Sequence, residues 1–152
     1  MEARISNPAT LLPGAFEGIQ AVIKSVNQSG VAPATLELVH LRVSQINGCA
    51  WCLNYGVKNA KQAGETDERL ALVAGWREAH CFTDAEKAAF ALAEAETRLA
   101  DRADVPDDVW DAAAKHYDEK QLAGLVLWIA MTNLFNRANV TTRQPADAPL
   151  GG

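Results

Sequence analysis

The 152-residue sequence has no apolar run long enough to cross a bilayer. The longest run extends from Leu122 to Phe135, which is shorter than the roughly 18 residues that a membrane-spanning helix needs. Asn133 lies inside this run and Asn136 directly after it, and both would be costly in lipid. Inside a protein core or a subunit interface the same amides can find hydrogen-bond partners. The run therefore predicts a buried helix, and no membrane association is expected.

Positive charge and cysteine are also scarce. Lys and Arg number 14 against 19 Asp and Glu, a formal net charge of -5, so electrostatic binding of nucleic acid is not expected. The N-terminal residues have neither the basic region nor the apolar core of a secretory signal, and we expect a cytoplasmic protein. Three cysteines, two of them closely spaced, suit a redox or metal-binding role better than a secreted disulfide framework.

Helical patterns follow one another along the chain, and no segment is a convincing β-strand. Apolar spacing, capping residues and breakers such as Asn47-Gly48 place the helix ends. The predicted helices cover residues 13–29, 33–47, 49–64, 66–76, 83–100, 105–113 and from about 119 to 140. We expect one all-α domain over residues 1–152, with residues 141–152 forming a loose tail or an arm on a neighbouring subunit.

The chemically distinctive motif is Cys49-Ala50-Trp51-Cys52 at the start of the third predicted helix. Cysteines at positions i and i+3 share one helix face, so their sulfur atoms can approach bonding distance. The positive end of the helix dipole stabilises a thiolate, and position alone favours Cys49 as the more activated thiol. The pair can also be two packed cysteines or half of a zinc site with His80 and Cys81, although adjacent zinc ligands are awkward.

The surroundings of the pair add a family resemblance. The run Glu-Leu-Val-His-Leu-Arg-Val-Ser-Gln-Ile-Asn-Gly-Cys-Ala-Trp-Cys (37–52), its continuations at 61–66 and 76–78, and the segments 82–89 and 129–137 resemble AhpD-like alkylhydroperoxidases. These proteins belong to the carboxymuconolactone decarboxylase family, and the resemblance covers most of residues 34–140. It implies an all-helical fold with the cysteine pair in a helix hairpin, assembled as a homotrimer or hexamer.

The resemblance also implies an antioxidant activity in which a cysteine reduces a hydroperoxide, with no cofactor or metal, and an external dithiol or protein reductant restores the thiols. By position, Cys52 matches the thiol that attacks the peroxide, Cys49 its resolving partner, and Glu37 the acid of a proton relay. The helix dipole argues for Cys49 as the activated thiol instead. We follow the family for these roles, because burial and neighbouring groups can outweigh the dipole.

The sequence departs from the family pattern at Gly56, where the family has a histidine four residues after the second cysteine. Glycine supplies no base, so the relay cannot be carried over whole. His40, three residues after Glu37 on nearly the same helix face, is the candidate substitute, although a lone histidine in an apolar helix is more often a packed residue. A water molecule above Gly56 is the other candidate.

These observations predict a thiol-dependent hydroperoxide reductase. The first alternative is a degenerate family member whose cysteines retain only thiol–disulfide exchange or a structural role, because no base lies one turn after Cys52. A carboxymuconolactone decarboxylase is a weaker alternative, since that reaction does not need paired cysteines. A zinc-binding module is the third alternative.

Overall fold

The computed structural model describes residues 2–149, and all regular secondary structure within this range is helical. The elements are α1 (Pro8–Leu11), α2 (Ala15–Asn27), α3 (Pro33–Asn47), α4 (Ala50–Gln62), α5 (Asp67–Leu72), η1 (Val73–Gly75), α6 (Asp84–Thr97), α7 (Leu99–Arg102), α8 (Asp107–Ala114) and α9 (Glu119–Thr142). The all-α class predicted from the sequence is confirmed. None of the described helices is both long and apolar enough to cross a membrane.

The helix ends follow the capping chemistry of the sequence. Gly48 adopts a left-handed conformation (φ 68°) and ends α3, and Thr83 forms a capping box with Glu86 at the start of α6. The helix predicted over 66–76 is interrupted, because α5 gives way to the tighter turn of η1. Residues three apart align in such a turn, which lets Val73 and Trp76 enter the core together.

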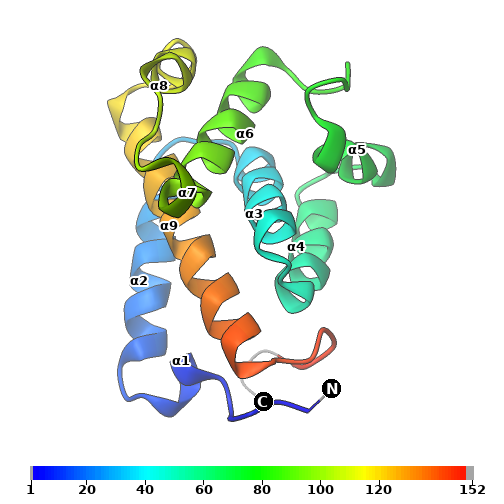
Figure 1. Cartoon of the computed structure of the whole chain (residues 1–152), viewed down its shortest axis with the longest axis vertical. Helices are drawn as coiled ribbons and strands as arrows, with labels where there is room; N and C mark the ends of the chain where they lie inside the picture. Colours follow the sequence, from blue (N-terminus) through cyan, green and yellow to red (C-terminus); the bar gives the residue numbers. More distant parts are fainter. Residues whose placement is uncertain (1, 150–152) are drawn as a thin grey trace.

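Helix α3 lies at the centre of the molecule and packs against α4, α6 and α9 (Figure 1). One side of α3 contributes Val39 and Val43 to a core cluster shared with Ile129 of α9. Its other side contributes Leu38 to a second cluster that contains Phe90 of α6. Because apolar residues surround α3 on all sides, this helix is buried along most of its length.

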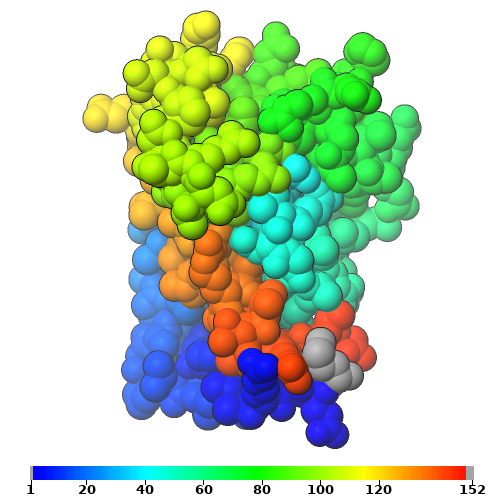
Figure 2. Space-filling model, in the orientation of Figure 1, coloured from blue at the N-terminus to red at the C-terminus, as the bar shows by residue number. Residues whose placement is uncertain are grey.

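The two ends of the described chain lie near the start of α4 (Figure 1), and the N-terminal helices and the last residues meet at the same end of the space-filling view (Figure 2). Residues 141 and 142 complete α9. The Trp51 indole donates to the carbonyl of Ala148 (2.8 Å), and the Asn54 amide donates to the carbonyl of Ala146 (2.8 Å). The described part of the predicted tail thus contacts α4 of its own chain, and residues 150–152 lie outside the described residues.

The buried carboxylate of Glu94 connects α6 to α3 and to the segment after η1. Glu94 of α6 accepts hydrogen bonds from Arg42 (2.8 Å), Arg77 (2.6 Å) and the Trp76 indole (2.9 Å). Burial acts to raise the pKa of Glu94, but the bonds from Arg77, Trp76 and Arg42 outweigh it and lower the pKa to about 2. The cluster links α3, α6 and the segment after η1.

Replacing Glu94 should therefore destabilise the fold. We expect Glu94→Ala to lower the free energy of unfolding by about 3–5 kcal/mol, because it leaves the largely buried Arg42 guanidinium without its carboxylate. Urea titration followed by circular dichroism measures this change. The exposed Glu78 is the matched control, and Glu78→Ala should change the value by less than about 0.5 kcal/mol. Equal losses in both variants would contradict a structural role for Glu94.

Candidate active site

The Cys49–Cys52 pair lies at the turn of the helix hairpin formed by α3 and α4. The left-handed Gly48 redirects the chain, Cys49 is the N-cap of α4, and Cys52 is in its first turn. The two residues form a disulfide, with Cα atoms 5.3 Å apart, and the Cys52 N–H donates to the Cys49 sulfur (3.3 Å). Their exposed fractions are 1% and 0%. The two sulfurs are within bonding distance, as the spacing allows, and both cysteines are buried although Gly48 and Ala50 beside them are exposed.

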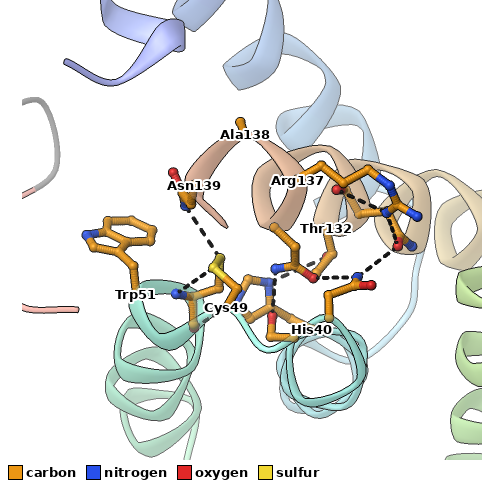
Figure 3. Close-up of a disulfide and its surroundings, with 12 residues drawn as sticks. His40, Cys49, Trp51, Thr132, Arg137, Ala138 and Asn139 are labelled. Atoms are coloured by element: carbon orange, nitrogen blue, oxygen red, sulfur yellow. Dashed lines mark hydrogen bonds between the residues drawn. A yellow bond between two sulfur atoms is a disulfide. The ribbon is translucent and has the colours of Figure 1, made fainter. Parts of the chain in front are cut away.

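A polar stripe on α9 faces this hairpin. Thr132, Asn136 and Asn139 are spaced by four and three residues, and all three are buried. The Asn139 amide donates to the Cys52 sulfur (3.4 Å), and in Figure 3 its side chain points from α9 toward the disulfide. The Asn136 amide donates to the Ser44 hydroxyl (3.0 Å). Asn139 was missed by the sequence analysis, although polar residues recurring at helical spacing in an apolar helix are a usable signal.

His40 reaches the backbone of Cys52. Its Nε2 lies 3.1 Å from the Cys52 carbonyl oxygen, and since a carbonyl only accepts, Nε2 carries the proton. Nδ1 lies 3.5 Å from the Thr132 hydroxyl oxygen, and that hydroxyl donates to the Trp128 carbonyl (2.8 Å). Burial lowers the pKa of His40, so the ring is neutral at pH 7. The hydrogen bond to the sulfur comes from Asn139 instead.

Gly56 is buried directly against the His40 ring. A Cβ atom at position 56 would lie 2.7 Å from His40 Cδ2 and 2.9 Å from a methyl carbon of Leu41. Real Cβ atoms almost never show contacts this short, so a side chain fits at position 56 only if its neighbours shift. The position of the family histidine is therefore filled by the imidazole of another helix.

A cavity of about 550 Å³ lies between α1, α2, α3, α4 and α9, and its wall includes Trp51, the residue between the two cysteines. Apolar and aromatic side chains form most of its wall: Leu12, Phe16, Ile19, Ile23, Leu36, Trp51, Tyr55, Trp128, Leu134 and Phe135. Glu37, His40, Asn59 and Asn139 supply polar groups in the same wall. Because Asn139 both lines the cavity and bonds to the Cys52 sulfur, it connects this space to the thiol pair.

The Glu37 carboxyl can give and take a proton near neutral pH. Burial raises its pKa from 4.5 to about 7, and the side-chain amide of Asn59 offsets part of this rise. A group with a pKa near the working pH is suited to general acid–base chemistry. Glu37 and His40 lie one helical turn apart and line the same cavity.

The four residues singled out in the sequence, Glu37, His40, Cys49 and Cys52, all belong to the α3–α4 hairpin. His40 contacts the Cys52 backbone, whereas Glu37 bonds to Asn59, seven residues after Cys52 in α4. Cys81 packs against the core cluster of Trp76 and Phe90. Within residues 2–149, no group of three or more His, Cys, Asp or Glu side chains is placed to hold a metal ion.

Comparison with known proteins agrees with this architecture. The model of the carboxymuconolactone decarboxylase family matches residues 13–95. YdfG of Bacillus subtilis, an uncharacterized protein, is 38% identical over 117 residues, covering 77% of this chain and 79% of its own. YnjA of Escherichia coli, also uncharacterized, is 32% identical over 120 residues, covering 78% of this chain and 64% of its own. The chain belongs to the carboxymuconolactone decarboxylase family.

Solved structures extend the comparison to the whole fold. ATU0492 of Agrobacterium tumefaciens is described as a protein of unknown function and provisionally as the antioxidant defence protein AhpD. It superposes with a TM-score of 0.88 at 30% identity, covering 97% of this chain and all of the other. The debrominase Bmp8, solved with 2,3,4-tribromopyrrole, shares the fold at a TM-score of 0.75 and 19% identity, covering 90% of this chain and 72% of its own. The AhpD-like resemblance predicted from the sequence is confirmed.

The environment of Glu37 predicts a pH-dependent stability. Its pKa is higher in the folded chain than in the unfolded one, so its contribution is fully present below pH 4.5 and is lost as the pH rises through 7. We expect the stability of the native chain relative to Glu37→Gln to fall by about 3 kcal/mol between pH 4.5 and 8, since each pKa unit is worth about 1.4 kcal/mol.

Urea unfolding at a series of pH values measures this difference. Glu78→Gln, at an exposed position, is the control and should track the native chain throughout. A stability difference between native chain and Glu37→Gln that does not vary with pH would show that Glu37 titrates normally.

Proposed function

We propose that the protein is a thiol-dependent hydroperoxide reductase whose dithiol is Cys49 and Cys52. The observation that carries the proposal is Asn139, which bonds to the Cys52 sulfur and lines the same apolar cavity as the titrating Glu37 carboxyl. A hydroperoxide in this cavity meets a proton source, a largely apolar wall and Asn139, which separates it from the Cys52 sulfur. The antioxidant description of the Agrobacterium relative supports the same class of reaction.

The reaction starts from the reduced pair. The Cys52 thiolate attacks the terminal oxygen of the hydroperoxide, the O–O bond breaks, and the alkoxide takes a proton from Glu37 to leave as the alcohol. Cys52 is then a sulfenic acid. Cys49 attacks that sulfur, forms the disulfide and releases the oxygen as water. An external dithiol reduces the disulfide by exchange and is itself oxidised, so one hydroperoxide and one dithiol give one alcohol, one water and one disulfide.

The position of each sulfur supports this division of roles. The Cys52 sulfur accepts a hydrogen bond from the amide of Asn139, which lines the cavity. The Cys49 sulfur instead accepts a hydrogen bond from the Cys52 backbone N–H at the start of α4. A thiolate at a helix N-terminus is stabilised, which suits Cys49 as the nucleophile of the second step. The dipole argument for Cys49 and the family assignment of Cys52 then describe different steps.

Cysteine variants test the proposal. Native protein with a dithiol donor should consume cumene hydroperoxide faster than hydrogen peroxide, because the apolar cavity holds the larger substrate. Cys52→Ser should reduce consumption to the protein-free rate. Cys49→Ser should be oxidised once and yield a sulfenic acid that dimedone traps on Cys52. Cys81→Ser, outside the pair, is the matched control and should keep native activity.

Each contrary result has a distinct meaning. If native protein exchanges its disulfide with dithiols but consumes no hydroperoxide, the chain is a thiol–disulfide exchange protein. If dimedone labels Cys49 in Cys52→Ser and leaves Cys52 unlabelled in Cys49→Ser, the two roles are reversed.

Assembly of several copies is part of the same proposal. Leu127 and Leu134 are seven residues apart on one face of α9, and the side chain of each is 47% exposed. Phe16 of α2, which lines the same cavity as Leu134, is 43% exposed. Exposed apolar residues that adjoin one another in a single patch mark interaction sites such as subunit contacts. We expect sedimentation equilibrium to give a trimer or hexamer for the native chain and a smaller species for Leu127→Glu/Leu134→Glu. A native monomer would contradict the assembly.

A further inference from the structure

His40 and Gly56 share one space between α3 and α4. The His40 ring is 3% exposed, and its Cδ2 and Nε2 atoms lie 2.7 and 3.2 Å from where a Cβ of residue 56 would be. Any side chain at position 56 therefore displaces this ring. The two residues belong to consecutive helices, and the identity of one limits the identity of the other.

The missing side chain also leaves the Cys52 carbonyl accessible. In an α-helix this carbonyl accepts the N–H of residue 56, which leaves its second lone pair free. The Nε2–H of His40 takes that lone pair at 3.1 Å. Glycine at position 56 thus permits a hydrogen bond from α3 to the residue that bears the proposed reactive sulfur.

We infer that His40 is the positioning imidazole of the thiol site and that residue 56 is glycine because the His40 ring occupies its side-chain space. The imidazole comes from α3 rather than from α4. It holds the first turn of α4 through the Cys52 carbonyl, and the same turn donates the Cys52 N–H to the Cys49 sulfur. Its action on the sulfurs is through this backbone.

The inference rests on the Cys49–Cys52 dithiol of the proposed function, but it does not depend on a hydroperoxide being the oxidant. Its test therefore reads the thiols directly. In reduced protein, the rate of Cys52 alkylation by iodoacetamide is followed by mass spectrometry, and the equilibrium of the disulfide with glutathione is measured in parallel. Circular dichroism reports whether each variant is folded.

Two substitutions of His40 form a matched pair. Glutamine keeps an N–H donor at nearly the position of Nε2, whereas leucine fills similar space without a donor. We expect His40→Leu to slow Cys52 alkylation about tenfold, the equivalent of one lost hydrogen bond of about 1.4 kcal/mol. His40→Gln should stay within about twofold of the native rate.

A second set of variants moves the imidazole from position 40 to position 56. Gly56→His should slow alkylation, because both rings compete for one space. His40→Ala/Gly56→His, which moves the imidazole to α4, should react at least about fivefold faster than His40→Ala alone. Gly56→Ala tests the space without an imidazole and should also slow alkylation, since its Cβ displaces the ring.

The results separate the two proposals. Equal alkylation and glutathione equilibria in His40→Leu, His40→Gln and native protein would overturn the inference, as would a double variant no better than His40→Ala. If His40→Leu does not fold, the alkylation rates of Gly56→Ala and His40→Gln test the inference in its place. Gly56→Ala should then react more slowly than His40→Gln, and a native-like rate in Gly56→Ala would overturn the inference. Loss of peroxide consumption with these differences intact would overturn the proposed function alone.

Discussion

The contact between the His40 ring and the backbone of Gly56 is the constraint on which the thiol site depends. It sets how closely α3 and α4 approach, since a Cβ at position 56 would lie 2.7 Å from the ring. The same approach brings Nε2 within 3.1 Å of the Cys52 carbonyl. The absence of one side chain therefore determines the geometry of the turn that carries both sulfurs.

Helix α9 completes the site from the opposite side. Asn139 donates to the Cys52 sulfur, and the Thr132 hydroxyl oxygen lies 3.5 Å from Nδ1 of His40 (Figure 3). Asn136 donates to the Ser44 hydroxyl of α3. Buried polar groups are costly unless they are paired. Asn136 and Asn139 have partners in the hairpin, and the Thr132 hydroxyl donates to the Trp128 carbonyl of its own helix. This network specifies one rotational setting of α9, because turning the helix would leave the amides unpaired among apolar side chains.

The cavity gives the site its chemical character. Burial in its largely apolar wall raises the pKa of Glu37 to about 7 and lowers that of His40. Near pH 7 His40 is therefore neutral and Glu37 is about half protonated, in a space suited to an apolar ligand. The sulfurs themselves are buried, and Asn139 connects Cys52 to this space. In the proposed reaction, proton transfer depends on Glu37, the cavity carboxyl whose pKa lies near neutral pH.

Much of the fold could be predicted from local signals. Asn47-Gly48 and the Thr83–Glu86 capping box act over a few residues, so the ends of α3 and α6 follow from the sequence. The break after α5 could not be predicted, because the pattern through Trp76 is compatible with a continuous helix. The tighter turn there serves the packing of Val73 and Trp76 against helices that are distant in sequence.

The sequence by itself determined the family and the helix hairpin, and it placed Cys49 and Cys52 within bonding reach of each other, because these features depend on residues that are close along the chain. Only the tertiary structure decided what surrounds the sulfurs. Asn139 is 87 residues from Cys52, and the ring that fills the space above Gly56 comes from α3. Helical spacing shows which residues share a face, but the rotation and separation of packed helices decide which of those faces meet.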